Sequence, residues 1–267
     1  MRKSGKSLLC NIKVEHKVNS TEEKIYEKNC RDDYVAIYVT SGTGRYLVEG
    51  AEIKFYPGTL ILIKPFEYYT VSIDSDLTYE RYIIGFSLGA VADEAEEAFN
   101  KLFELKNGES GIFCSECLNH KAITEILKEL DLRYNDCENS SNDILLPLLS
   151  KFILTVASEK HQKIRHDEFA LPTRVISYIN QYILKDVSLE VISKRFFLSK
   201  YYLCRMFKKH IGTTVHSYIS QKRVLYAKEM IETGETASNA AYQVGFGDYS
   251  AFYRAYVKLV GKTPSVK

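Results

Sequence analysis

The sequence predicts an α+β protein of two domains, in which a β-barrel or sandwich with amphipathic helices precedes an all-α domain. Its 267 residues suffice for two ordinary domains. Short strand-like runs give way to helical spacing at about residue 92. The charge also divides, because residues 1–170 carry 21 Lys and Arg against 28 Asp and Glu, whereas residues 171–267 carry 15 against 6. We therefore assign residues 1–160 and 171–267 to two domains and residues 161–170 to a linker.

The region from Tyr34 to Phe86 is expected to be all β. Runs rich in Tyr, Ile and Val alternate with turn signals, which are Ser41-Gly42-Thr43-Gly44, Glu49-Gly50 and Pro57-Gly58. The run from Thr59 to Ile63 is too uniformly apolar for a sheet with one solvated face. We expect a small barrel or sandwich whose two faces are both covered.

Three later segments have apolar residues at helical spacing: Ala92–Leu105, Leu118–Tyr134 and Asp143–Lys160. Their apolar faces need partners, which can be the β region, each other or a second subunit. We expect residues 118–160 to form a homodimer interface, because two amphipathic helices offer more apolar surface than one small barrel needs.

The composition excludes several classes of protein. Hydrophobic residues make up 45% and charged residues 26%, which is typical of a globular rather than a disordered or membrane protein. No apolar run approaches the ~20 residues of a spanning helix, and Met1–Cys10 lacks a signal-peptide core, so we expect a cytoplasmic protein with no membrane partner. Cys114 and Cys117 could be half a zinc site or a redox pair, but no second pair completes it, which favours free thiols.

The C-terminal domain contains a quasi-repeat. Its two copies are residues 189–199 and 237–248. Each copy predicts a short helix, a tight turn and the start of a second helix. Ser193 and Ala241 are small residues at matching places, where crossed helices approach closely, and Ser199 and Asp248 can cap the second helices.

The second helix of each copy divides into an apolar and a free face. The predicted core positions are Leu203, Met206, Phe207, His210, Phe252, Ala255, Tyr256 and Leu259, and the predicted free positions are Tyr201, Cys204, Arg205, Lys208, Ser250, Ala251, Arg254 and Lys258. One helix with a basic face is usually only a solvated surface, but two copies in a basic domain favour nucleic-acid binding. In a major groove, Arg can bond guanine and Lys can bond phosphate.

The same residues form a recognisable pattern. It runs Leu198-Ser199-x-x-Tyr202-Leu203-x-Arg205-x-Phe207-Lys208-x-x-x-Gly212, then Tyr218 and Arg223, then Ala241-x-x-x-Gly245-Phe246-x-Asp248-x-Ser250-x-Phe252-x-Arg254, then Gly261-x-Thr263-Pro264. Over residues 171–267 this pattern closely resembles the AraC/XylS family of transcription regulators. The resemblance implies two helix-turn-helix units, bridged by a helix at 214–233, that read successive major grooves of double-stranded DNA.

The resemblance also implies site residues and partners. Its base-reading positions fall on Tyr201, Cys204, Arg205, Tyr249, Ser250 and Arg254, and we expect Ser199, Lys200, Lys208 and Lys258 to complete the DNA-binding set. Cys204 stands where the family often has a polar side chain, and Val257 where Lys is usual, so DNA shape and phosphates should carry more of the recognition. RNA polymerase is the expected protein partner.

The β region resembles the cupin-like sensor domain of the same family at Ser41-Gly42-x-Gly44, Tyr56-Pro57-Gly58 and Lys64-Pro65. Enzymatic cupins hold a metal with several His, but this chain has none between His16 and His120, and Tyr69 takes the usual His position. We therefore expect no catalytic residue, metal or cofactor. The candidate effector-binding residues, which suit a sugar or another small polar ligand but could equally be core residues, are Tyr38, Tyr46, Tyr56, Tyr69, Arg81 and Tyr82.

The leading hypothesis is therefore an effector-responsive, dimeric, sequence-specific DNA-binding regulator. One alternative is a cupin-type enzyme with a helical appendage, which the scarcity of His and the repeated helical motif disfavour. The other is a ligand-independent regulator whose β domain only dimerises. A collapsed barrel interior would favour this second alternative.

Overall fold

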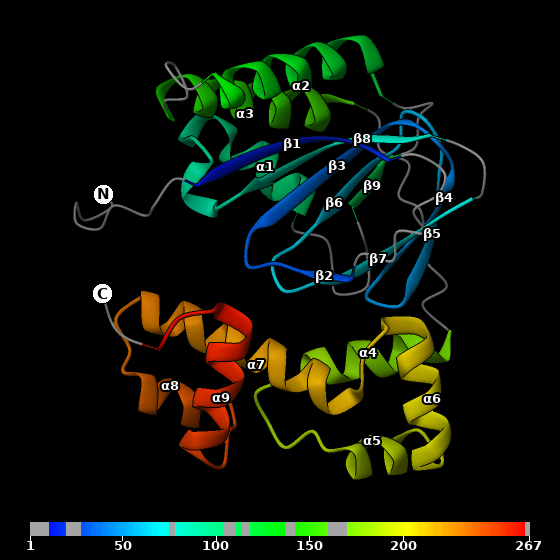
Figure 1. Cartoon of the computed structure of the whole chain (residues 1–267), viewed down its shortest axis with the longest axis vertical. Helices are drawn as coiled ribbons and strands as arrows, with labels where there is room; N and C mark the ends of the chain where they lie inside the picture. The colour runs from blue at the N-terminus through cyan, green and yellow to red at the C-terminus, as the bar shows by residue number, and fades with distance from the viewer. Residues whose placement is uncertain are drawn as a thin grey trace. The chain divides into compact units, whose positions relative to one another are not determined.

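A computed structural model describes residues 11–19, 28–74, 78–103, 111–113, 118–136, 142–159 and 170–264. The chain divides into two compact units, Met1–His166 and Asp167–Lys267 (Figure 1). We call these the N-terminal unit and the C-terminal unit. Nearly all of the expected linker, and Cys114 and Cys117, lie outside the described residues.

The N-terminal unit is built on two antiparallel sheets. Its strands are β1 (Ile12–Asn19), β2 (Lys28–Cys30), β3 (Tyr34–Ser41), β4 (Gly44–Val48), β5 (Ala51–Phe55), β6 (Leu60–Ile63), β7 (Tyr68–Ile73), β8 (Tyr79–Phe86) and β9 (Gly111–Phe113). One sheet has the order β1-β8-β3-β6-β9 and the other β2-β7-β4-β5. The two-residue turn Glu49-Gly50 joins β4 to β5 with positive φ at both residues, the geometry that matches strand twist in a tight hairpin.

Successive side chains of a strand point to opposite faces, and in this unit they feed two separate cores. On β3, Val35, Ile37 and Val39 lie in the core between the sheets. Ala36 and Tyr38 lie in a second core on the outer face of the five-stranded sheet. Both faces of this sheet are therefore covered, as the uniformly apolar runs predict.

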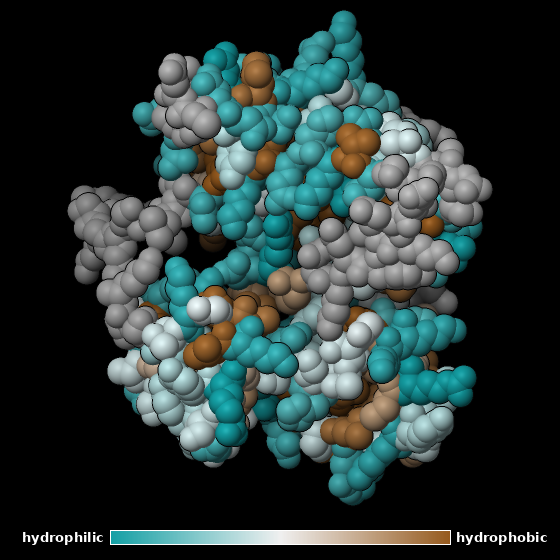
Figure 2. All heavy atoms as spheres, viewed as in Figure 1, coloured by the Kyte–Doolittle hydropathy of each residue, from teal (hydrophilic) through white to brown (hydrophobic). Residues whose placement is uncertain are grey.

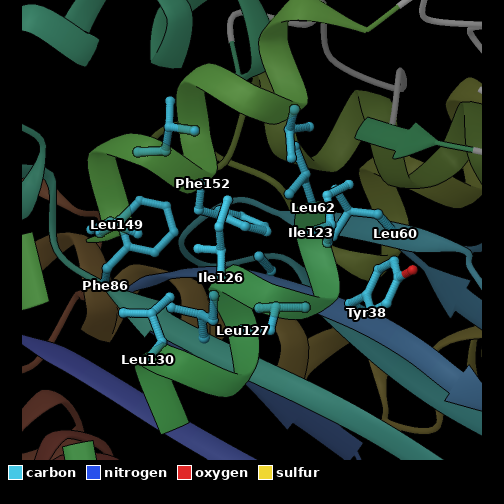
Figure 3. Close-up of a cluster of buried hydrophobic side chains, with 14 of the residues drawn as sticks. Tyr38, Leu60, Leu62, Phe86, Ile123, Ile126, Leu127, Leu130, Leu149 and Phe152 are labelled. Carbon is cyan, nitrogen blue, oxygen red and sulfur yellow. The ribbon is translucent and has the colours of Figure 1, made fainter. Parts of the chain in front are cut away.

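Helices cover that outer face. They are α1 (Glu96–Phe103), preceded by two 3-10 turns (Leu88–Ala90 and Asp93–Ala95), α2 (His120–Asn135) and α3 (Asn142–Ser158). The apolar stripe of α2 packs on Leu149 and Phe152 of α3 and on strand residues such as Leu62 (Figure 3). The stripe consists of Ile123, Ile126, Leu127 and Leu130.

The C-terminal unit is helical throughout its described residues. Its helices are α4 (Leu171–Gln181), α5 (Leu189–Arg195), α6 (Lys200–Ile211), α7 (Val215–Glu232), α8 (Ala237–Gln243) and α9 (Tyr249–Val260). The long helix α7 joins the α5–α6 pair to the α8–α9 pair (Figure 1). Among the described residues, no helix is long and apolar enough to cross a membrane.

Candidate nucleic-acid interface

Two helix-turn-helix units occupy the C-terminal unit. We call residues 188–212, with α5 and α6, the first reading unit, and residues 236–261, with α8 and α9, the second reading unit. A side-chain oxygen caps each of the four helices by accepting a backbone N–H of its first turn. These caps are Ser188, Ser199, Thr236 and Asp248. The two caps expected from the sequence are therefore present.

The turn between the helices has the same hydrogen bond in both units. The amide of Leu198 donates to the carbonyl of Ser193 at 2.9 Å, and that of Phe246 donates to the carbonyl of Ala241 at 3.0 Å. The preceding residue has positive φ in each case, 55° at Phe197 and 90° at Gly245. Because bulky residues rarely adopt this conformation, the fold imposes it on Phe197.

The recognition helices α6 and α9 end alike. Gly212 and Gly261 both have φ of 74° and donate their amide to the carbonyl four residues earlier. Each helix has 12 residues, so Lys200 corresponds to Tyr249 and Arg205 to Arg254. The two recognition helices therefore have the same length and the same kind of C-terminal end.

Most of the expected core face of each recognition helix is buried, but His210, Ala255 and Leu259 are only partly buried. Leu203, Met206 and Phe207 are buried on α6, and Phe252 and Tyr256 are buried on α9. Phe207 meets Tyr218 of α7 edge to face, with ring centroids 5.3 Å apart. Phe252 belongs to a core shared by α7, α8 and α9. Each recognition helix therefore packs against α7.

The opposite faces are solvent-exposed. Every residue of the expected DNA-binding set is exposed, namely Ser199, Lys200, Tyr201, Cys204, Arg205, Lys208, Tyr249, Ser250, Arg254 and Lys258. Tyr201 is the more exposed of the two tyrosines in this set, at 76%. Tyr249 and Tyr253 are neighbours on α9, with ring centroids 6.4 Å apart. Each recognition helix therefore presents a polar, partly aromatic surface on the side away from the core.

Further exposed residues lie near these faces but were not predicted. Lys194 and Arg195 end α5, Lys209 follows Lys208 on α6, and Tyr253 lies one turn after Tyr249. Helical spacing could have identified two of them, because Lys209 and Lys258 hold the same position in their helices, as do Cys204 and Tyr253.

One carboxylate partly neutralises the positive charge of the first reading unit. Glu190 lies 3.0 Å from the Lys194 ammonium and 3.5 Å from that of Lys200. The hydrogen bond from Lys194 lowers the pKa of Glu190 below its usual value. All three side chains are more than half exposed, so water screens these pairs and they hold the lysines weakly.

The candidate effector residues do not lie together. Tyr46, Tyr69 and Arg81 are buried between the two sheets. The guanidinium of Arg81 lies over the Tyr79 ring at 4.3 Å, and its Nη1 donates to Oδ1 of Asn19 at 2.6 Å. The hydroxyls of Tyr46 and Tyr79 hydrogen-bond to each other. We call Tyr46, Tyr69 and Arg81 the inter-sheet cluster; their polar groups are buried among the apolar side chains of the core between the sheets.

The other three candidates lie elsewhere. Tyr38 faces the helices, where its hydroxyl is 2.8 Å from Nδ1 of His120 and burial raises the pKa of Tyr38. Tyr82 stacks on His16 with ring centroids 4.3 Å apart. Tyr56 is exposed beyond the end of β5. Three of the six candidates thus share one place and three do not.

Within the described residues, no group of three or more His, Cys, Asp or Glu is arranged to hold a metal ion. Cys204 is an exposed free thiol, and Cys30 forms no disulfide with another described residue.

Two family models match the chain. The model of the AraC-like ligand binding domain matches residues 11–146, and the model of a helix-turn-helix domain matches residues 192–266. The first covers the sheets and most of the helices of the N-terminal unit. The second begins within α5 and runs past α9, so it spans both recognition helices.

The chain is also similar to known regulators. It is 25% identical over 232 residues to the uncharacterized HTH-type transcriptional regulator YbfI of Bacillus subtilis, covering 84% of this chain and 80% of that protein. Over 106 residues it is 31% identical to the regulatory protein SoxS of Escherichia coli, covering 39% of this chain and 92% of SoxS. The crystal structure of ToxT from Vibrio cholerae aligns with 17% identity over 95% of both chains, at a TM-score of 0.39.

Proposed function

The chain belongs to the AraC family of DNA-binding transcription regulators, and from this premise we propose that α6 and α9 read successive major grooves of one duplex. The observation that carries the proposal is the repeated exposed face of the recognition helices. Arg205 and Arg254 hold the same position in helices of the same length, and both are exposed.

The length of α7 supports this arrangement. Its 18 residues span about 27 Å at 1.5 Å per residue. Adjacent major grooves on one face of DNA lie roughly 34 Å apart. A rigid helix of this length between two reading units is of the right order to present both to one face of a duplex.

The roles of individual residues follow from their chemistry. Arg205 and Arg254 carry planar guanidinium groups that can bond guanine O6 and N7 together, so we assign them base reading. Tyr201, Cys204, Tyr249 and Ser250 share the exposed faces and contact neighbouring base edges. Lys200, Lys208 and Lys258 bond phosphates, and the exposed hydroxyl of Ser199 lies at the end of α6 that enters the groove.

Dimerisation through α2 and α3 also belongs to the proposal, although the main apolar stripe is already used inside the N-terminal unit. Figure 2 shows mainly hydrophilic residues on the visible face of these helices, with isolated hydrophobic residues among them. Leu132 of α2 and Leu154 of α3 remain exposed, at 62% and 43%. A homodimer contact through these helices would cover them.

For the N-terminal unit we propose effector binding at the inter-sheet cluster of Tyr46, Tyr69 and Arg81. A small polar ligand such as a sugar fits a site with aromatic faces and a few polar groups. The ligand-independent alternative is favoured by one observation: Tyr46, Phe55 and Tyr79 fill the same space and are at most 1% exposed. An effector would therefore have to displace side chains to enter.

An enzymatic role is disfavoured, because the similar proteins carry the names of transcription regulators. RNA polymerase in the cytoplasm is the partner that a transcription regulator needs, and we include it in the proposal. The test is titration of the intact chain with a random-sequence duplex at several salt concentrations. We expect log affinity to fall steeply with log salt, whereas a flat dependence would refute phosphate binding.

A further inference from the structure

The two reading units match closely in backbone but not in charge. Residues 188–212 carry six Lys and Arg and one acidic residue. Residues 236–261 carry only two Lys and Arg, with one acidic residue. The two shared cations, Arg205 with Arg254 and Lys209 with Lys258, occupy equal positions on α6 and α9. The difference therefore comes from particular substitutions rather than from a different fold.

Four cations of the first reading unit have uncharged counterparts. Lys194, Arg195, Lys200 and Lys208 correspond to Tyr242, Gln243, Tyr249 and Val257. All four cations are exposed. Two lie at the end of α5 and two on α6, so the first reading unit offers cations from both of its helices to a phosphate backbone.

The caps of the two recognition helices also differ in charge. Ser199 caps α6 with a neutral hydroxyl that accepts from the amide of Tyr202 at 3.2 Å. Asp248 caps α9 with a carboxylate that accepts from the amides of Ser250 and Ala251. This negative charge sits at the end of α9 that a helix-turn-helix inserts most deeply, where it opposes phosphates.

The first reading unit keeps its charge despite Glu190. That carboxylate pairs with Lys194 and Lys200, but all three side chains are well exposed. A phosphate can replace such a screened partner at little cost. The uncharged residues of α9, in contrast, include Tyr249, Ser250 and Tyr253, which can contact base edges or thymine methyl groups but release no counterions.

We propose that the two units divide the work of binding DNA. The first reading unit is the phosphate anchor and supplies most of the salt-dependent affinity. The second reading unit contributes sequence preference through Tyr249, Ser250, Tyr253 and Arg254, with few phosphate contacts. This division presupposes the DNA binding proposed above, but it assigns unequal roles to two helices that have the same backbone geometry.

The test exchanges charge between the helices in the intact chain. In one variant, three positions of the first reading unit receive the residues found at the matching positions of the second: Ser199→Asp, Lys200→Tyr and Lys208→Val. The reciprocal variant carries Asp248→Ser, Tyr249→Lys and Val257→Lys. A third variant combines both sets, so its net charge equals that of the native chain. Ser and Asp are both good caps, and circular dichroism checks that each variant folds.

The probes are a random-sequence duplex and a duplex that the intact chain enriches from a random pool. On the random duplex we expect the first variant to lose about two units of salt slope and the reciprocal variant to gain about two. Ethylation interference on the enriched duplex should place most essential phosphates of the native complex in one half of the site. In the combined variant each reading unit carries four Lys and Arg, so the essential phosphates should become more evenly divided between the two halves.

Two results would overturn the division. Essential phosphates spread evenly over both halves in the native complex would do so, even if a variant failed to fold. An unchanged pattern in the combined variant would do so as well. Failure of the intact chain to enrich any duplex would be a different result, because it would refute the proposed function itself.

Discussion

Arg223 on α7 donates a hydrogen bond from Nη1 to the carbonyl of Gly245, at 2.8 Å, in the turn of the second reading unit. Its Nε donates to the carbonyl of Ile183 at 2.9 Å and its Nη2 to that of Lys185 at 2.6 Å. Those two carbonyls belong to the segment between α4 and α5. One guanidinium therefore joins the first half of the C-terminal unit to the turn that precedes α9.

Replacing Arg223 by Ala should destabilise the chain by about 1–3 kcal/mol, because three backbone carbonyls lose a charged donor. Burial lowers the pKa of Arg223 but leaves it charged at neutral pH, so the effect should not change between pH 6 and pH 8. Urea unfolding measures the loss. Lys228→Ala on the same helix is the control, and an equal loss in both variants would show that the three contacts are unimportant.

Gly245→Ala should cost about 1–2 kcal/mol. The residue has φ of 90°, and an added Cβ would lie 3.0 Å from Cζ of Arg223. Gly247→Ala is a matched control two residues away, because its Cβ would meet nothing within 4 Å. Thermal unfolding of the two variants should separate them by several degrees, and coinciding transitions would contradict the steric account.

Leu132→Asp and Leu154→Asp should each convert a dimer to a monomer, since a charge cannot be buried unpaired in an apolar contact. Leu88→Asp serves as the control, because Leu88 is also exposed but lies in a 3-10 turn outside α2 and α3. Sedimentation velocity at micromolar concentration measures the outcome. A native chain that is already monomeric there would rule out this interface.

Arg81→Gln should abolish any increase in unfolding temperature that a panel of monosaccharides gives to the native chain. A ligand at a hundred times its Kd stabilises a protein by about 2.7 kcal/mol, which a thermal scan detects readily. Tyr56→Phe, at an exposed position, should keep the response. No increase with any sugar in the native chain would favour the ligand-independent regulator, which the filled space between the sheets also favours.

The recognition helices could be predicted from sequence because their determinants are local. Helical spacing separated Leu203 from Arg205, and a Ser or Asp before an apolar stripe marked each cap. The positive φ of Phe197 could not be foreseen, because nothing in a Phe indicates that conformation. It follows from the turn that the two packed helices require.

The effector residues were harder because they depend on which face of a strand is the inner one. Arg81 and Tyr82 are neighbours on β8, so strand geometry sends them to opposite faces and they cannot line one site. That much was readable from the sequence. Whether Arg81 or Tyr82 points toward the second sheet depends on the pairing between distant strands. Here the sheets enclose Arg81 with Tyr46, while the helices cover Tyr82.

The most direct test of the account compares Arg205→Ala and Arg254→Ala with Lys208→Ala and Lys258→Ala, each on an enriched duplex and on a random one. Loss of a bidentate guanine contact should cost about 1–3 kcal/mol on the enriched duplex and much less on the random one. Loss of a lysine should weaken binding to both alike and reduce the salt slope by about one unit. Uniform losses for the arginine variants on both duplexes would make them phosphate contacts and contradict base reading by α6 and α9.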